Sequence, residues 1–173
     1  GIAHCAVSIA LRHNGKPEVA VVFDPFLNEM FTAARGEGAM LNGHRIRVGT
    51  RTSLDGAIIG TAFPVRFRER MDAYLELFGR LLGSCADVRR MGAASLDLCY
   101  VACGRFDGFL EQGLKPWDYA AGELIIREAG GLVTDFLGTP GYTKTGNIVT
   151  ANPNVVRAML QICNPQELAS VLR

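Results

Sequence analysis

The sequence predicts an α/β fold in which an antiparallel meander is followed by alternating strands and helices. Three observations predict it. Two apolar runs flank the dipeptide Asn14-Gly15, which is the pattern of a β-hairpin. The apolar run 56–61 precedes helical spacing over 67–83, which is the pattern of a strand followed by a helix. Residues 118–129 repeat the helical spacing and end at paired glycines, a common helix terminator.

The meander is predicted to occupy residues 1–55. Apolar runs separated by polar turns predict its strands, at 5–11, 19–23, 29–34 and 39–41. Asn42-Gly43 predicts a second tight turn. The segment 36–38, Gly-Glu-Gly, has the glycine spacing of a phosphate loop. No helix and no Gly-Lys-Ser/Thr follows it, so we interpret it as a turn.

Residues 56–173 are predicted to form the C-terminal α/β part. The strand at 56–61 leads through a loop at Phe63-Pro64 into a helix, whose apolar stripe is Met71, Tyr74, Leu75, Phe78, Leu81 and Leu82. Thr61 ends that strand, and ligands collect at strand ends in such sheets. It is therefore either a substrate-side residue or a hydroxyl bonded to the backbone.

The remaining segments continue the alternation. A run of small residues, 92–95, opens an apolar helix that extends through Ala102. Strands are predicted at 132–135 and 148–151, with a loop at 138–146 between them. The last two elements are helices, one capped by Asn152-Pro153 and extending to about Ile162, and a short one that starts at Pro165.

The helix predicted from Asp118 to Ala129 is the element around which a site is expected. Its inward stripe is Ala121, Leu124, Ile125 and Ala129, with Glu123 and Arg127 pointing elsewhere. Its first turn carries little bulk after the aspartate, so an anion such as phosphate can approach the unpaired backbone N–H groups. Asp118 is either a helix N-cap or a metal ligand beside a phosphate.

The composition indicates one compact globular unit. The 173 residues are 49% hydrophobic with a mean hydropathy of +0.16, which is enough for one sizeable core. The net charge is +1 and the pI about 7.8, so strong direct binding to nucleic acid or to a membrane surface is not expected. No apolar run reaches the length of about 18 residues that a membrane-spanning helix needs.

Histidine, cysteine and serine patterns argue against several other site chemistries. His4, His13 and His44 have no partner at metal-ligand spacing, so a zinc site is not expected. The five cysteines include no Cys-x-x-Cys pair and are interpreted as reduced thiols in a cytoplasm. Ser8 lacks the Gly-x-Ser-x-Gly elbow of serine hydrolases.

The stretch 117–122, Trp-Asp-x-Ala-Ala-Gly, followed by Glu-Ala-Gly-Gly at 128–131, closely resembles a signature of the inositol monophosphatase family. The resemblance extends through residues 89–98, 104–111 and 146–149, and the sequence of these segments is most similar to the bacterial inositol-1-monophosphatase branch. It implies a layered α/β/α/β/α sandwich and a homodimer. It also implies magnesium-dependent, lithium-sensitive hydrolysis of a phosphate monoester such as inositol phosphate.

The resemblance assigns four residues to the site. Asp118 matches an aspartate that binds magnesium and lies near the attacked phosphate, so it is the candidate catalytic, metal-binding and substrate-binding residue. Glu111 matches a glutamate that accepts hydrogen bonds from sugar hydroxyls, and Ala94 falls where the family offers a backbone contact to the sugar. Arg89 matches a substrate-binding arginine.

Three further charged residues have other expected roles. Arg90 is expected to serve the subunit interface, although spacing alone does not separate it from Arg89, and without the resemblance the two arginines favour a solvated charge pair. Asp97 and Asp107 are expected to be structural, the first within a helix and the second in a turn before a strand.

The resemblance covers about the C-terminal two thirds of a family member. In the family, the apolar strand at 5–11 follows an Asp-Pro-x-Asp-Gly-Thr motif, and a glutamate ligand lies earlier, among N-terminal helices. These three acidic metal ligands are absent from the sequence, so the chain alone is expected to be inactive and to act as part of a longer phosphatase. There, metal ions would neutralise the phosphate, lower the pKa of a bound water and stabilise the leaving oxygen.

Two alternative functions stay open. Members of the bacterial branch take part in the transcription of ribosomal RNA through contacts to the transcription machinery, so the chain is alternatively a non-catalytic binding module. Related sugar and nucleotide phosphatases, such as fructose-1,6-bisphosphatase, share the core motif, and the motif residues do not choose between their substrates.

Overall fold

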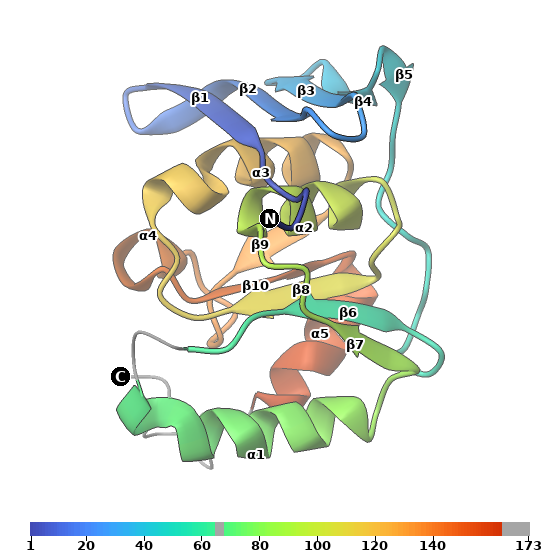
Figure 1. The fold of residues 1–173 in the computed structure, drawn as a ribbon, viewed down its shortest axis with the longest axis vertical. Helices are drawn as coiled ribbons and strands as arrows, with labels where there is room; N and C mark the ends of the chain where they lie inside the picture. Colours follow the sequence, from blue (N-terminus) through green and yellow to red (C-terminus); the bar gives the residue numbers. More distant parts are fainter. Residues whose placement is uncertain (65–67, 164–173) are drawn as a thin grey trace.

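The computed structural model describes residues 1–64 and 68–163. Two five-stranded sheets alternate with two sets of helices, in the order sheet, helices, sheet, helices from the top of Figure 1 to the bottom. The α/β layered fold predicted from the sequence is therefore confirmed. The predicted helix from Pro165 lies outside the described residues.

The first sheet is an antiparallel meander in which each strand pairs with its neighbour in sequence. Its strands are β1 (Val7–His13), β2 (Lys16–Asp24), β3 (Glu29–Ala34), β4 (Gly38–Leu41) and β5 (His44–Arg45). Asn14 and Gly15 have φ values of 50° and 75°, and Asn42 and Gly43 have 49° and 79°. Both predicted tight turns thus have the left-handed backbone of a type I′ hairpin.

The second sheet combines parallel and antiparallel strands. Its strands are β6 (Ile58–Thr61), β7 (Asp87–Arg89), β8 (Gly108–Glu111), β9 (Leu132–Thr134) and β10 (Ile148–Ala151), in the order β7-β6-β8-β10-β9. β6 pairs in parallel with β7 and β8, while β10 pairs antiparallel with β8 and β9. The sequence did not predict β7, because three residues with one apolar side chain give no periodicity.

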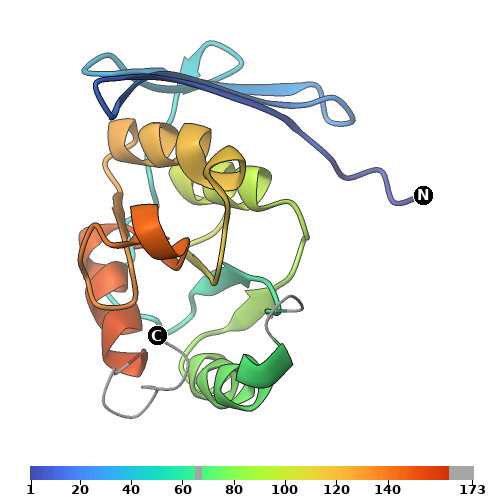
Figure 2. The same ribbon diagram turned by 90° about the vertical axis from the view of Figure 1, so that its left-hand side faces the viewer.

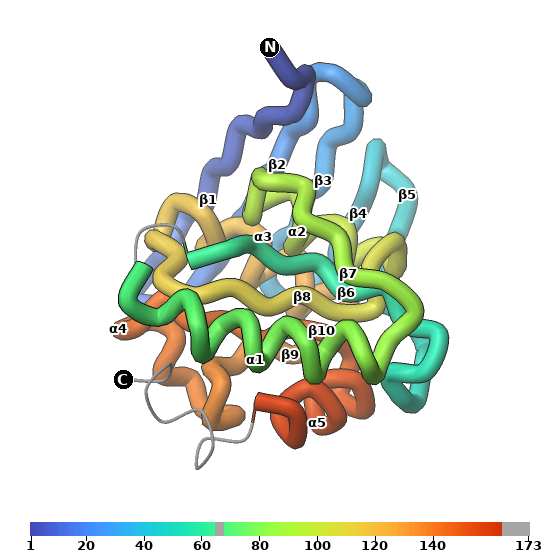
Figure 3. The backbone as a smooth tube through the Cα atoms, turned by 60° about the horizontal axis from the view of Figure 1, so that its bottom comes forward, coloured from blue at the N-terminus to red at the C-terminus, as the bar shows by residue number. Residues whose placement is uncertain are grey.

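The helices α1 (Met71–Leu82) and α5 (Pro153–Ile162) lie side by side on the outer face of the second sheet (Figure 3). A short 3-10 turn, η1 (Arg68–Arg70), precedes α1. The buried stripe of α1 is Tyr74, Leu77 and Leu81, whereas the predicted Leu75 and Leu82 are about half exposed. The predicted cap of α5 is confirmed, since Asn152 Oδ1 accepts the backbone N–H groups of Asn154 and Val155 at 2.9 and 3.0 Å.

The helices α2 (Ala94–Ala102) and α3 (Pro116–Glu128) fill the space between the two sheets (Figures 1 and 2). They cross at Gly122, where a Cβ atom would lie 2.6 Å from Leu98 Cβ, so a side chain has no room there. The short helix α4 (Tyr142–Thr145) follows β9 and was predicted as part of a loop. Among the described residues, no helix is long and apolar enough to cross a membrane.

Because α3 contacts both the first sheet and α2, it is buried on more than one side. The prediction that Glu123 points away from the core is therefore wrong: Glu123 is 4% exposed. Arg12 Nη2 donates to Glu123 Oε2 at 2.6 Å, and the Tyr142 hydroxyl donates to Oε1 at 2.6 Å. Burial and the Glu123 hydrogen bond raise the pKa of Tyr142 to about 12. The carboxylate is thus compensated by partners from β1 and α4, far away in sequence.

Candidate active site

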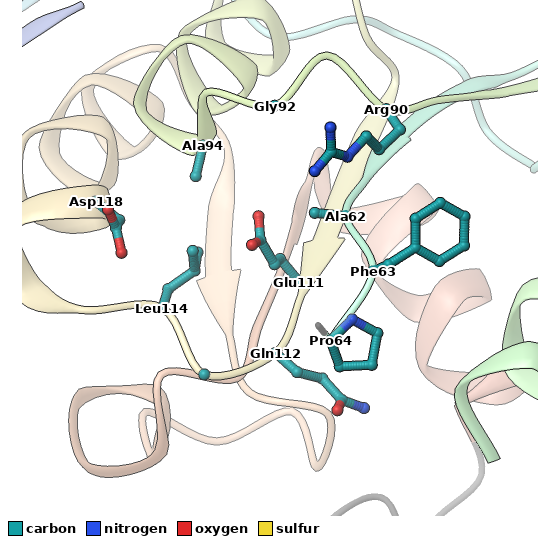
Figure 4. A pocket seen from close by; sticks show the side chains of 11 residues that line it. Ala62, Phe63, Pro64, Arg90, Gly92, Ala94, Glu111, Gln112, Leu114 and Asp118 are labelled. Atoms are coloured by element: carbon teal, nitrogen blue, oxygen red, sulfur yellow. The ribbon is translucent and has the colours of Figure 1, made fainter. Parts of the chain in front are cut away.

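One pocket lies where β8 ends and where α2 and α3 begin (Figure 4). Its volume is about 230 Å³. Three segments that are separate in the sequence form its walls, namely 62–64, 90–94 and 111–118, from which Ala62, Phe63, Pro64, Arg90, Gly92, Ala94, Glu111, Gln112, Gly113, Leu114 and Asp118 line it. The pocket therefore contains three of the four predicted site residues, Ala94, Glu111 and Asp118.

Asp118 lies in the first turn of α3, with its carboxylate directed at the pocket (Figure 4). The helix begins at Pro116, two residues earlier than predicted, because Pro116 supplies a φ that suits the first helical position. Asp118 Oδ2 accepts the backbone N–H of Lys115 at 2.8 Å. The N-cap interpretation of Asp118 is therefore wrong, because Lys115 is the N-cap residue and Asp118 is the third residue of the helix. The Asp118 carboxylate still faces the pocket, so its hydrogen bond with the Lys115 N–H does not exclude a ligand role.

Glu111 is the last residue of β8, and its carboxylate points into the middle of the pocket in Figure 4. Side chains alternate along a strand, so Glu111 shares a face with Phe109 and not with Leu110. Phe109 packs in the core between the sheets, whereas Leu110 packs toward α1 and α5. Glu111 therefore lies on the side of the second sheet that faces α2 and α3.

Ala94 is the first residue of α2, and its methyl group borders the pocket opposite Glu111 (Figure 4). The preceding residue, Ala93, has an extended backbone with φ −135° and ψ 90° and no side-chain cap. Two helices, α2 and α3, consequently begin at one pocket. The unpaired N–H groups and the positive end of each helix dipole favour an anion at such a position.

The two neighbouring arginines have different positions. Arg89 ends β7, is not among the residues that line the pocket, and forms an ion pair with Asp87 at 2.6 Å. Arg90 lines the pocket, and its guanidinium extends toward the space above Glu111 (Figure 4). The structure thus places at the pocket the arginine that was expected at a subunit interface. Sequence spacing could not separate the two, because the end of a strand decides which side chain faces which way.

Thr61 lies under the pocket and not at its surface. Its hydroxyl donates to the carbonyl of Leu110 at 2.9 Å and lies 2.9 Å from the Tyr74 hydroxyl. The interpretation of Thr61 as a backbone-bonded hydroxyl is therefore confirmed. Burial raises the pKa of Tyr74, so this hydroxyl stays protonated near neutral pH.

The loop after β8 was missed as a pocket wall by the sequence reasoning. Gly113 N–H donates to Asn147 Oδ1 at 3.1 Å, and Leu114 N–H donates to the Gly146 carbonyl at 2.9 Å. Gly146 has φ +72°, and a Cβ there would overlap the Leu114 carbonyl. The sequence signal was present in the motif 146–149, whose glycine and asparagine hold this loop.

The described residues do not form a complete magnesium site. Within 1–64 and 68–163 no group of three or more His, Cys, Asp or Glu side chains could hold a metal ion. Asp118 and Glu111 are the carboxylates that line the pocket. Mg²⁺ takes six oxygen ligands in octahedral geometry, so one or two protein carboxylates hold it only with further ligands from elsewhere.

Asp107, which was predicted to have a structural role, directly precedes β8. Asp107 Oδ2 accepts the backbone N–H of Ile58 at 2.9 Å and the Nε–H of Arg51 at 3.1 Å. It therefore joins the turn before β8 to the start of β6, as its structural role predicts.

Comparison with known proteins agrees with the fold. The family model described as "Inositol monophosphatase family" matches residues 1–167. The chain belongs to the inositol monophosphatase family. The predicted relationship is thereby confirmed.

Three members of the inositol monophosphatase family illustrate the relationship. Nus factor SuhB of Escherichia coli is 57% identical over 159 residues, which are 92% of this chain and 60% of the relative. The structure of the extragenic suppressor protein SuhB of Bartonella henselae has a TM-score of 0.89 at 40% identity, over 92% of this chain and 61% of that one. A structure of inositol monophosphatase II of Staphylococcus aureus with inositol monophosphate bound has a TM-score of 0.84 at 26% identity, over 96% of this chain and 64% of that one.

These matches also define how much of a family member the chain represents. It spans 60% of the length of the Escherichia coli relative. The chain therefore represents part of a member of the inositol monophosphatase family.

Proposed function

We propose that this chain is part of a magnesium-dependent phosphatase that hydrolyses inositol monophosphate by attack of a metal-activated water. The observation that carries the proposal is the pocket itself, where Asp118, Glu111 and the first turns of two helices meet in a member of this family. Two helix N-termini suit a phosphate, and a carboxylate suits polyol hydroxyls. These are the two parts of an inositol phosphate.

In this proposal each pocket residue has one task. Asp118 contributes one oxygen ligand to magnesium, which when bound supplies charge neutralisation and an acidic water. Glu111 accepts hydrogen bonds from the polyol, and the backbone at Ala94 contacts the sugar. Arg90 takes the substrate-binding task that the resemblance gave to Arg89, because Arg90 lines the pocket. Holding the substrate in one orientation is itself a large part of the rate.

The outer face of the first sheet supports the view that the chain acts within a longer one. Val7, Ile9 and Leu11 on β1 are 52%, 61% and 58% exposed, and Val19 and Met30 continue this apolar face on β2 and β3. Monomeric proteins rarely leave such a continuous apolar surface in water. A further layer of the same protein would cover it and would bring the remaining metal ligands.

The test is release of phosphate from inositol 1-phosphate with Mg²⁺. It compares the 173-residue chain with a version extended at its N-terminus by the portion that the family resemblance implies. We expect turnover only in the extended version, and loss of turnover there on Asp118→Asn, which keeps the side-chain size but removes a charged ligand. Turnover by the short chain would contradict the proposed ligand set.

A substrate panel decides between this activity and that of related phosphatases. Fructose 1,6-bisphosphate and a nucleotide monophosphate are the alternatives, measured in the extended version under the same conditions. If kcat/KM is higher for one of these two compounds than for inositol 1-phosphate, that compound is the better substrate, and the reaction is still hydrolysis of a phosphate monoester. The same proposal includes inhibition by lithium, a homodimer and a cytoplasmic location.

A second function is favoured by the name of the relatives. Several relatives at 50% to 57% identity are named Nus factor SuhB, so we also propose a contact with the transcription machinery. A pull-down with a purified bacterial transcription complex tests it. Capture that survives Asp118→Asn but is lost on substitution of surface arginines would establish a partner role independent of catalysis.

A further inference from the structure

One buried acid near the pocket has no task in the proposed function. Asp97 lies one turn into α2 and is 1% exposed, and both of its carboxyl oxygens are enclosed without a hydrogen-bond partner in the described structure. Burying an ionised carboxylate in this way is costly, and an asparagine would fill the same space without that cost. A merely structural role therefore leaves the choice of an acid unexplained.

The fold places Asp97 beneath the pocket wall. Residues three apart on a helix share a face, so Asp97 lies under Ala94, which borders the pocket. That helix packs on β8, whose last residue, Glu111, points toward the same layer between sheet and helices. The two carboxyls thus approach one interior region from facing elements.

The charged and titratable groups around Asp97 come from several elements. Burial raises the pKa of Asp97 to about 7, with the Glu111 carboxylate adding to the rise and the Arg90 guanidinium opposing it. On its own helix the neighbouring titratable groups are Cys99 and Tyr100, whose own pKa values burial also raises, so both are neutral at the pH of interest. At the start of α3, Asp118 is a further carboxylate that lines the pocket. The groups that act on Asp97 are therefore the Glu111 carboxylate and the Arg90 guanidinium, and Asp118 is a third acid at the same pocket.

We propose that Asp97 is a positioning residue that acts as a neutral acid behind Glu111, so that only one carboxyl of this pair is ionised while an anionic polyol substrate binds. The inference rests on the proposed function. When Asp97 loses its proton, a second negative charge repels the substrate phosphate and competes for Arg90. The Michaelis constant then rises, while the chemical step, in which Asp97 takes no part, changes little.

The kinetic test uses the extended, complete protein and inositol 1-phosphate. KM and kcat are measured between about pH 6 and about pH 8.5 for the wild type, Asp97→Asn and the surface control Asp72→Asn. We expect the wild-type KM to rise across this range by about tenfold more than that of Asp97→Asn, the size of effect that ~1.4 kcal/mol of repulsion gives. Ionisation of the substrate phosphate is common to all three proteins and cancels in the comparison.

The control Asp72 lies exposed on α1, so Asp72→Asn should follow the wild type. Identical KM profiles for the wild type and Asp97→Asn would overturn the proposal. A loss of kcat in Asp97→Asn that is equal at every pH would also overturn it, because that pattern belongs to a structural or chemical role.

A second measurement is independent of turnover. Carbon-13 shifts of the side-chain carboxyls are followed against pH without metal or substrate, and the Asp97 signal is assigned by its absence in Asp97→Asn. A midpoint near 7 supports the neutral acid, and a midpoint at the ordinary aspartate value overturns it. If no variant releases phosphate at any pH, the proposed function fails, and this titration still decides whether one carboxyl of the pair or both are ionised.

Discussion

At the residue scale, the pocket depends on which of two adjacent arginines faces it. Arg89 is paired with Asp87 at the end of β7, and Arg90 turns toward Glu111. An arginine that donates to a phosphate or a polyol contributes through charge-assisted hydrogen bonds. The neighbouring side chain, held away by its own partner, contributes nothing comparable.

This difference gives a matched pair of variants. In the extended protein, Arg90→Ala should raise KM for inositol 1-phosphate by about 10- to 100-fold, the loss of one charge-assisted hydrogen bond. Arg89→Ala, which removes the same side chain one position earlier, should leave KM within about twofold, because an exposed ion pair contributes little. The reverse result would return the substrate-binding role to Arg89.

Asp97 also contributes to the pH dependence of stability. The folded-state pKa of Asp97 is about 7, above the ordinary value of 3.8, so the folded state keeps this proton when the unfolded state has lost it. The contribution of Asp97 to the free energy of unfolding is fully present below pH 3.8 and is lost as the pH rises through about 7.

Asp97→Asn should therefore raise the free energy of unfolding little near pH 4 and by up to roughly 4 kcal/mol above pH 7, less whatever the unpaired amide costs. Urea denaturation of the 173-residue chain, with and without Asp97→Asn, measures the free energy of unfolding at several pH values. Parallel stability curves for the two proteins would show that the folded-state pKa of Asp97 is not raised.

At the element scale, the contact between α2 and α3 fixes the distance between the two helix starts at the pocket. Gly122 allows the close approach, since any Cβ there would meet the side chain of Leu98. Gly122→Ala should cost about 1 to 3 kcal/mol by overpacking. Gly79→Ala on α1, where nothing lies within 4 Å of a Cβ, should instead stabilise by about 0.5 to 1 kcal/mol through helix propensity.

Denaturation midpoints measured in parallel distinguish the two glycine variants. Equal effects of the same sign would mean that helix propensity, and not the packing of α2 on α3, governs both sites. Gly122→Ala should also change the geometry of the pocket, because a shift of α3 moves Asp118 relative to Ala94.

Local signals explain which elements the sequence could predict. The hairpins at Asn14-Gly15 and Asn42-Gly43 were predicted because the turn residues specify the left-handed backbone by themselves. The start of α5 was predicted because Asn152 caps it with its own side chain. The strand β7 was not predicted, because its place in the sheet comes from pairing with β6 and not from its own three residues.

At the scale of the whole molecule, the residues that sequence reasoning misplaced are those whose environment is made by distant segments. Glu123 is buried because Arg12 and Tyr142 reach it from the first sheet and from α4. Arg90 faces the pocket because β7 ends beside β6. Asp118, Glu111 and Ala94 were placed at one pocket by a family resemblance, which already contains such long-range information.

Because Gly146 and Asn147 hold the pocket loop through hydrogen bonds, the pocket forms late during synthesis of the chain. On the ribosome, Glu111 leaves the exit tunnel before β10, which must pair with β8, and before the glycine and asparagine that hold residues 113 and 114. At ordinary synthesis rates the interval to Ala151 is roughly 2 to 8 s, far longer than a loop needs to close. During it the second sheet lacks the strand between β8 and β9, so the pocket is among the last features of the described chain to form.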